Sequence, residues 1–392
     1  MPHTPSDPRR DRQRQQSLVA PFVTTSLCLA PPGGAPSGTP DLRDPDTKPS
    51  RSVVDSRAGP NDRVRGVAAT FRQIGVLGLG LIGGSLLRAV RATGRDCWGY
   101  DLDPATLIAA GEDGFEIAGS VAEAAADADL LVLAMPLTEV PQALAELSSA
   151  IGPRTVLTDV GTLKRPVAAA VESTLPGTRF VGGHPLAGTE NSGWRAADAE
   201  LFDGAPWSLT LTDDDAPHGV AHLDAWLGIA DLVCELGAHP VPTTAAEQDD
   251  AVARVIGLPH VLAEVLALTG LSGGPLGLSL AAGSYTTGSR VARTRPELVA
   301  TWCDGNVALT AALDEVISLL ATTRDALAAG RSVLPLAREG HQARMNWESR
   351  SARPVVVPAD RESLLEHGRA GGWITSVDLA GSVPAVHGMV PR

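Results

Sequence analysis

The sequence contains little cysteine and has a deficit of positive charge. Its four cysteines (Cys28, Cys97, Cys234 and Cys303) lie far apart and form no Cys-x-x-Cys pair. This spacing argues against a disulfide framework and a structural zinc site, and it favours a reducing, cytoplasmic location. The formal net charge is −13. An acidic balance of this size argues against nucleic acid as the main partner.

Long apolar runs are also missing. We find no run near the roughly 20 consecutive apolar residues that cross a bilayer, so we expect no membrane partner. Residues 17–30 follow several arginines and superficially resemble a signal peptide, but Pro21 and the polar residues 24–26 interrupt them. Residues 1–67 are rich in Pro, Gly, Ser, Asp and Arg and carry little to bury. That composition predicts a disordered N-terminal extension.

Apolar runs alternate with helical patterns over residues 68–242. Residues 72–79 contain a short apolar run that leads into Gly78, a helical pattern follows, and residues 96–101 read as the next strand. The continuous apolar run at 129–135 is typical of a strand buried on both faces. Further strands are expected at 155–159, 179–182, 207–211 and 234–241. The alternation predicts an α/β fold with a Rossmann-type, doubly wound parallel sheet.

The pattern becomes helical over residues 243–330. Residues 245–268 have helical periodicity with a kink expected at Pro259, and residues 296–329 form a second long helical stretch with a weak point at Gly305. These helices carry more apolar positions than a small monomeric domain can bury. We therefore predict an all-helical second domain through which the chain forms a homodimer.

Two segments beside these helices are less clearly patterned. Residues 270–288 are rich in Gly, Ser and Thr and are expected to be mostly loop. Residues 331–392 form a small C-terminal tail, in which a partial strand–helix–strand unit is expected at 354–358, 361–367 and 373–377.

A glycine-rich motif follows the first predicted strand and opens the first predicted helix. Residues 78–83 read Gly-x-Gly-x-x-Gly, with Leu81 and Ile82 at the helix start. In a dinucleotide site Gly78 would allow the tight turn, Gly80 would let the pyrophosphate approach the backbone, and Gly83 would let helix and strand pack closely. Asp101 lies 23 positions after Gly78, near the spacing for a carboxylate on the ribose 2′-hydroxyl. This carboxylate favours NAD over NADP.

The segment 182–194 is too rich in glycine to be a regular helix or strand. It contains four glycines and Pro185, together with one imidazole (His184) and one carboxylate (Glu190). A loop of fixed shape that carries such groups is where catalytic residues are often found. Together with the nucleotide motif it predicts an enzyme.

The order of five motifs resembles the prephenate dehydrogenase family of tyrosine biosynthesis, over about residues 72–330. The motifs are GLGLIGGS (78–85), TDVGTLK (158–164), GGHPLAGTE (182–190), LPH (258–260) and GSR (288–290). The resemblance implies NAD-linked oxidative decarboxylation of prephenate to 4-hydroxyphenylpyruvate.

The resemblance also implies roles for individual residues. His184 matches the base that faces the substrate's ring hydroxyl, and a neutral imidazole suits that task near pH 7. Thr162 matches a hydroxyl residue close to both the nicotinamide and the histidine. Arg290 matches the arginine that binds a substrate carboxylate, for which a guanidinium is well shaped. His260 matches a histidine near the substrate side chain, and Glu190 is expected to order the domain junction or gate the pocket.

Two departures from the family pattern leave alternatives open. Thr286 stands where relatives often have a basic residue, and Gly257 where some have a second histidine. Both changes remove groups near the substrate side chain, so arogenate is the alternative substrate. A β-hydroxyacid dehydrogenase is a more distant alternative, although residues 245–268 lack the lysine that such enzymes use as a base. A non-catalytic nucleotide sensor would be expected to lack His184 or Arg290.

Overall fold

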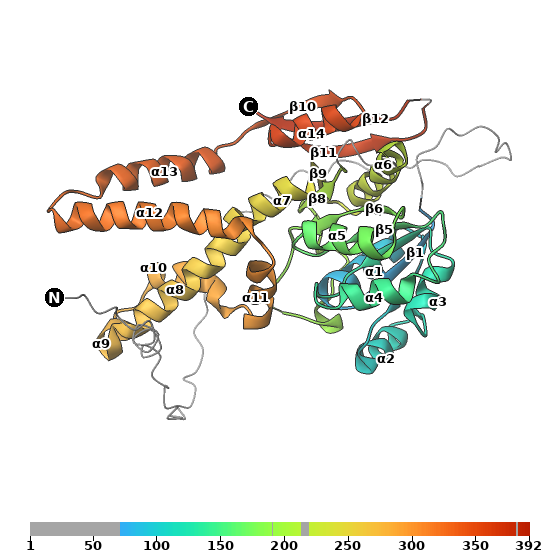
Figure 1. Ribbon diagram of the computed structural model, residues 1–392, viewed down its shortest axis with the longest axis horizontal. Helices are drawn as coiled ribbons and strands as arrows, with labels where there is room; N and C mark the ends of the chain where they lie inside the picture. Colours follow the sequence, from blue (N-terminus) through green and yellow to red (C-terminus); the bar gives the residue numbers. More distant parts are fainter. Residues whose placement is uncertain (1–70, 190, 213–218, 382) are drawn as a thin grey trace, which may run out of the picture. The chain divides into compact units, whose positions relative to one another are not determined.

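A six-stranded parallel sheet forms the first half of the described chain (Figure 1). The computed structural model describes residues 71–189, 191–212, 219–381 and 383–392. The strand order is β3-β2-β1-β4-β5-β6. These strands are Gln73–Leu77 (β1), Asp96–Tyr100 (β2), Glu116–Ile117 (β3), Leu130–Leu133 (β4), Val156–Asp159 (β5) and Arg179–Val181 (β6). The order reverses between β1 and β4, which is where nucleotides bind in doubly wound sheets.

Helices cover both faces of this sheet because its central strands are apolar throughout. The helices are Leu81–Ala92 (α1), Pro104–Glu112 (α2), Val121–Ala126 (α3), Val140–Leu147 (α4) and Arg165–Thr174 (α5). Along β4, Leu130 and Val132 belong to one buried cluster, and Leu131 and Leu133 to the other. The predicted Rossmann-type sheet is confirmed. The short elements β3 and α3 were not predicted.

The expectation that the glycine-rich segment 182–194 contains no strand was wrong, because its residues 183–185 form one strand of a second, smaller sheet. Its strands are Gly183–Pro185 (β7), Pro206–Thr210 (β8) and His239–Thr243 (β9), with β7 antiparallel to β8 and β8 parallel to β9. The last two correspond to strands predicted from sequence, but they do not extend the parallel sheet. Helix α6 (Gly219–Glu235) includes Cys234, so the strand expected from that residue starts five positions later.

The helical region begins two residues after β9. Helix α7 (Ala245–Val252) passes through a π-helical segment at Ala253–Gly257 into α8 (Leu258–Ser272). Pro259 lies inside this continuous helix, where its missing N–H removes a backbone hydrogen bond, so an irregularity at residues 253–257 just before it is expected. Helix α11 (Pro296–Asp304) meets α12 (Ala308–Ala328) at 97°, which confirms the weak point at Gly305.

One sequence-based expectation for this region was wrong. The segment 270–288 is mostly helical rather than loop, and contains Gly274–Ser279 (α9) and Gly283–Gly288 (α10) before the 3-10 turn Arg290–Arg293 (η3). The continuous helix Ala245–Ser272 has 28 residues and a window of mean hydropathy 1.7, of which 22% is buried. By length and composition alone this helix could cross a membrane, although it contains no run of about 20 consecutive apolar residues.

The C-terminal segment is more ordered than its sequence pattern predicts. Helix α13 (Leu334–Glu348) leads to a three-stranded antiparallel sheet of Ala352–Val357 (β10), Trp373–Asp378 (β11) and Ala385–Pro391 (β12). The predicted strand–helix–strand unit is present with α14 (Arg361–Arg369) as its helix, while α13 and β12 were missed. Leu364 and Ile374 join the same buried cluster as Trp226 of α6.

Candidate active site

The glycine-rich turn has the geometry that dinucleotide binding requires. Gly78 has φ +96°, and a Cβ there would lie 2.7 Å from the backbone of Ala134. A Cβ on Gly83 would lie 1.9 Å from the carbonyl oxygen of Gly78, whereas one on Gly80 would meet nothing within 4 Å. Gly80 precedes α1 and has no side chain with which to cap the first backbone N–H groups of the helix. The open space at Gly80 and the uncapped N–H groups of residues 81–83 therefore fit a pyrophosphate.

Asp101 lies at the end of β2 and closes this turn. Its carboxylate accepts hydrogen bonds from the backbone N–H of Leu79, at 2.6 Å, and from that of Asp103, at 2.8 Å. A cavity of about 330 Å³ is lined by Gly78, Gly80, Asp101 and Asp103 among others. A carboxylate beside such a cavity accepts hydrogen bonds from a ribose and repels a 2′-phosphate.

His184 is presented by β7, beside the carboxyl end of β5. The chain leaves the parallel sheet after Val181 and enters β7 through Gly183, whose Cβ would lie 2.6 Å from the carbonyl oxygen of Asp159. Only glycine fits there. His184 is 7% exposed, and burial together with nearby Lys164 lowers its pKa to about 3. The imidazole is therefore neutral near pH 7, with one of its two ring nitrogens protonated and the other bare.

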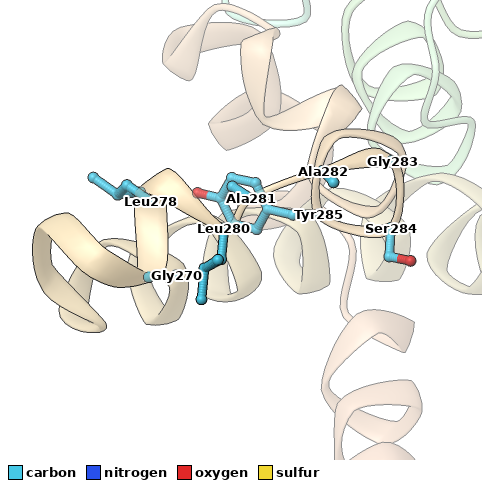
Figure 2. A pocket seen from close by; sticks show the side chains of 9 residues that line it. Gly270, Leu278, Leu280, Ala281, Ala282, Gly283, Ser284 and Tyr285 are labelled. Atoms are coloured by element: carbon cyan, nitrogen blue, oxygen red, sulfur yellow. The ribbon is translucent and has the colours of Figure 1, made fainter.

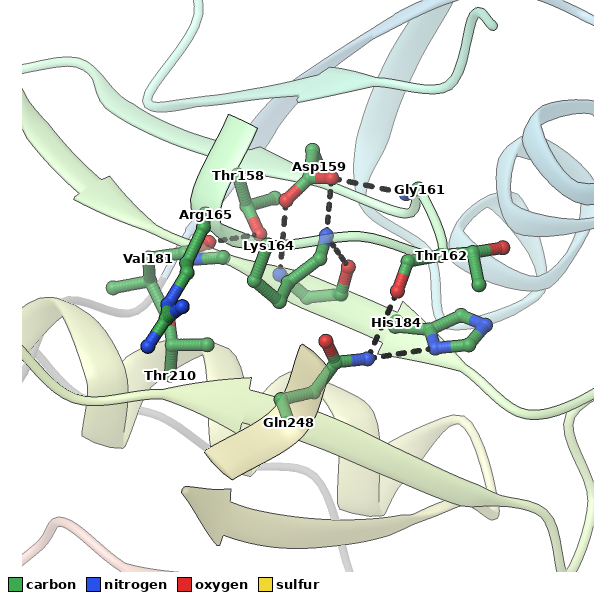
Figure 3. A network of polar contacts seen from close by, with 12 residues as sticks. Thr158, Asp159, Gly161, Thr162, Lys164, Arg165, Val181, His184, Thr210 and Gln248 are labelled. Atoms are coloured by element: carbon green, nitrogen blue, oxygen red, sulfur yellow. Dashed lines mark hydrogen bonds and ion pairs between the residues drawn. The ribbon is translucent and has the colours of Figure 1, made fainter. Parts of the chain in front are cut away.

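A buried amide joins His184 to Thr162 (Figure 3). The Nε2 of Gln248 on α7 donates to the carbonyl oxygen of Thr162, at 3.0 Å, and lies 3.0 Å from Nδ1 of His184. Gln248 is 3% exposed. The structure thus brings together the two residues predicted to be catalytic, although it is the Thr162 backbone rather than its hydroxyl that makes the contact. Thr162 does not cap α5, because Lys164 occupies that position.

A buried ion pair lies behind His184. Lys164 Nζ donates to Asp159 Oδ2 and to the carbonyl oxygen of Gly183, and both side chains are at most 2% exposed. Asp159 also accepts from the N–H of Gly161 at 3.0 Å and of Gly183 at 3.1 Å. Burial raises the pKa of Asp159 and lowers that of Lys164, while the contact between them opposes both shifts. The pair fixes the segment 159–164 to the strand that carries His184.

Asp249 ties the helical region to the same segment. Its carboxylate accepts from the backbone N–H of Lys164, at 2.7 Å, and of Arg165, at 3.1 Å. The negative charge of Asp249 beside the N-terminus of α5 also interacts favourably with the partial positive charge at that end of the helix. Asn306, in the elbow between α11 and α12, donates to the carbonyl oxygen of Asp249 at 2.8 Å.

The predicted substrate-binding residues lie elsewhere in the helical region. Arg290 begins η3 and is exposed, and among the described residues no contact joins it to His184. His260 packs edge-on against Trp302, with Nδ1 2.8 Å from the Ile256 carbonyl oxygen and Nε2 3.5 Å from Thr294 Oγ1. These contacts orient the turn that carries Arg290. Glu190 lies outside the described residues.

A second cavity, of about 370 Å³, lies among α8, α9 and α10 (Figure 2). Its lining is mostly Gly, Ala and Leu. Tyr285 is the titratable residue in it, and its hydroxyl donates to the Ala267 carbonyl oxygen at 3.3 Å. This lining offers no acid–base pair for catalysis.

Sequence reasoning missed Asp159, Lys164, Gln248 and Asp249. The first two lie in the motif TDVGTLK, and Lys48 and Lys164 are the only lysines in a chain that otherwise uses arginine. The rarity of lysine could therefore have singled out Lys164 as a residue with a special role. Gln248 and Asp249 lie on a helix of ordinary composition, and nothing local distinguishes them.

Comparisons with known proteins identify the family of this chain. The family model for the prephenate dehydrogenase nucleotide-binding domain matches residues 86–234. A cyclohexadienyl dehydrogenase of Zymomonas mobilis is 31% identical over 292 residues, which are 70% of this chain and 96% of that protein.

Two solved structures extend the likeness to the fold. A candidate prephenate dehydrogenase from Corynebacterium glutamicum is 38% identical with a TM-score of 0.67, covering 71% of this chain and 89% of its own. An arogenate dehydrogenase of Synechocystis is 28% identical with a TM-score of 0.59, covering 70% and 99%. Since the match spans nearly the whole of the Zymomonas relative and both halves of the fold, this chain belongs to the prephenate dehydrogenase family.

Proposed function

We propose that this chain catalyses the NAD-dependent oxidative decarboxylation of prephenate to 4-hydroxyphenylpyruvate, with His184 accepting a hydrogen bond from the ring hydroxyl. The buried, neutral imidazole of His184 beside Thr162 is the observation that carries this proposal. NAD, when bound, accepts the hydride from C4 of the substrate. The turn at Gly78–Gly83 would hold its pyrophosphate, and Asp101 its adenine ribose.

The proton balance of the reaction suits a weakly basic histidine. The substrate loses a hydride from C4 and CO2 from C1, and the electrons of the broken C1–carboxylate bond complete the aromatic ring. The hydroxyl proton stays in the product as that of the phenol, so no net proton is released. His184 has only to stabilise positive charge on the oxygen as hydride leaves, and then return the proton. A pKa of about 3 is compatible with that task because the ring gives the proton back readily.

Arg290 is the proposed partner of a substrate carboxylate. It is exposed within a single chain, and His260 braces the turn that holds it. Many apolar side chains on the same helices are also exposed, among them Leu268 (67%), Leu276 (72%) and Leu280 (73%). The proposed second copy would cover this surface and enclose Arg290.

The oligomeric state tests that part of the proposal. We expect the purified protein to have twice the mass of one chain by light scattering after gel filtration. Substitution of Leu268 and Leu280 by Glu should shift it toward the single-chain mass, because buried charge opposes association. A wild-type protein that has the mass of one chain at micromolar concentration would contradict the homodimer.

The proposed location is cytoplasmic, without a membrane partner; the free thiols of Cys97, Cys234 and Cys303 are consistent with it.

Arogenate is the second candidate substrate. Thr286 is a neutral, exposed residue one helical turn before Arg290, so it offers no charge to a keto-acid side chain. A site with fewer cations is more tolerant of an ammonium group.

The direct test of the function is to supply prephenate and arogenate separately, each with NAD and NADP. We expect the highest kcat/KM for prephenate with NAD, measured by NADH absorbance and matched mole for mole by released CO2. A higher kcat/KM with arogenate would reassign the substrate. NADP used as well as NAD would contradict the role given to Asp101.

A further inference from the structure

Gln248 sits where it can decide which nitrogen of His184 carries the proton. Neutral imidazole has one protonated and one bare nitrogen, and only the bare one accepts a hydrogen bond. Nδ1 of His184 faces the Gln248 amide, so Nε2 is the nitrogen left for the substrate (Figure 3). The partner of Nδ1 therefore controls what Nε2 can do.

The direction of the amide is set by the Thr162 carbonyl. A carbonyl oxygen can only accept, so the amide nitrogen of Gln248 must face it, as the 3.0 Å contact shows. The same nitrogen lies 3.0 Å from Nδ1. It therefore donates its second hydrogen to Nδ1, which leaves the ring proton on Nε2. In this state His184 can donate to a hydroxyl oxygen but cannot accept its proton.

The oxygen atom of the same amide is a buried acceptor that is not used. Gln248 Oε1 has no hydrogen-bond partner within the described ranges, although the side chain is 3% exposed. An orphaned buried carbonyl normally costs about 1–3 kcal/mol, so its retention calls for an explanation. After a half-turn of the amide, Oε1 would face Nδ1 and could only accept a hydrogen bond, which favours the tautomer that carries the proton on Nδ1 and has Nε2 bare.

We propose that Gln248 is a positioning residue that selects the tautomer of His184, with the Thr162 carbonyl holding the amide in its donating direction in the ligand-free protein. The half-turn accompanies a shift of the single ring proton, in which Nε2 releases a proton to solvent water, Nδ1 takes one up from water, and the net charge of the ring is unchanged. Nε2 is then the acceptor for the substrate hydroxyl. The half-turn on substrate binding rests on the proposed function, whereas the tautomer assigned to the ligand-free protein does not depend on it. No other described side chain contacts Nδ1.

Nitrogen-15 NMR of histidine-labelled protein tests the proposal directly. The chain has nine histidines, and the His184→Asn variant assigns the His184 signals by their loss. In the ligand-free wild type we expect Nδ1 bare and Nε2 protonated. With NAD and 4-hydroxyphenylpyruvate bound we expect the reverse, and likewise in Gln248→Glu, whose carboxylate can only accept. A proton on Nδ1 in the ligand-free wild type, or no change on ligand binding, would overturn the proposal.

Kinetics of matched variants supply the second readout. Gln248→Met keeps length and burial but removes donor and acceptor, and should lower kcat about 10–100-fold with little change in the KM for NAD, as loss of a histidine's hydrogen-bond partner does elsewhere. Gln342→Met removes an exposed amide that bonds Asn346 and should change neither. An unchanged kcat in Gln248→Met would overturn the proposal. If Gln248→Met does not fold, the NMR spectra of the wild type and of Gln248→Glu still test the tautomer proposal. Failure of the wild-type protein to turn over prephenate would instead refute the proposed function.

Discussion

Replacing His184 with Asn is expected to lower kcat for prephenate by about 10²–10⁴-fold, the range for losing a general base. Asn keeps the shape of the buried site but cannot accept and return a proton in this way. The affinity for NAD should change little, because the glycine turn and Asp101 lie on other strands. Steady-state kinetics and calorimetric titration with NAD separate the two effects.

The matched control is His387→Asn, which alters an exposed histidine on β12. It should retain wild-type kcat. Activity should also show no loss attributable to His184 as pH falls from 8 to 5, since burial holds the pKa of this group at about 3 in the free protein. Full activity of His184→Asn would contradict the assignment of His184 as the base.

Replacing Lys164 with Met is expected to reduce the free energy of unfolding by about 3–5 kcal/mol, the usual cost of leaving one member of a buried pair uncompensated. Asp159 would retain two backbone donors but lose its counter-charge, and the Gly183 carbonyl would lose its partner. Chemical denaturation at pH 7 measures the loss.

Two controls distinguish the charge effect from lost packing. Asp159→Asn combined with Lys164→Met removes both charges of the pair and should be more stable than Lys164→Met alone. In the single variant burial raises the folded pKa of Asp159 above its unfolded value. The folded chain then binds the extra proton, so the deficit relative to wild type should shrink as pH falls toward 4 and grow as pH rises. A deficit below 1 kcal/mol at every pH would contradict the role assigned to the pair.

Local sequence signals predicted the nucleotide half well. The tight turn at Gly78, the close contact at Gly83 and the acid at Asp101 depend on neighbours within one βαβ unit, and each is present as expected. Strand β4 is apolar on both faces, so its place at the sheet centre followed from composition alone.

Long-range contacts account for what was missed. Gln248 reaches His184 across 64 positions, and Asp249 reaches Lys164 across 85, so no local pattern could connect them. The helices at 274–288 were missed because their glycines suggested loop, whereas glycine also allows close packing there, as where the end of the Leu266 side chain lies against Gly288. Propensity was overridden there by tertiary contact.

The measurement that tests the account most directly is a crystal structure of the protein with NAD and 4-hydroxyphenylpyruvate bound. We expect His184 Nε2 to lie about 2.6–3.2 Å from the phenolic oxygen, and Arg290 of either copy to contact the pyruvyl carboxylate. A phenolic oxygen held by another residue, with His184 still covered and out of reach, would contradict it.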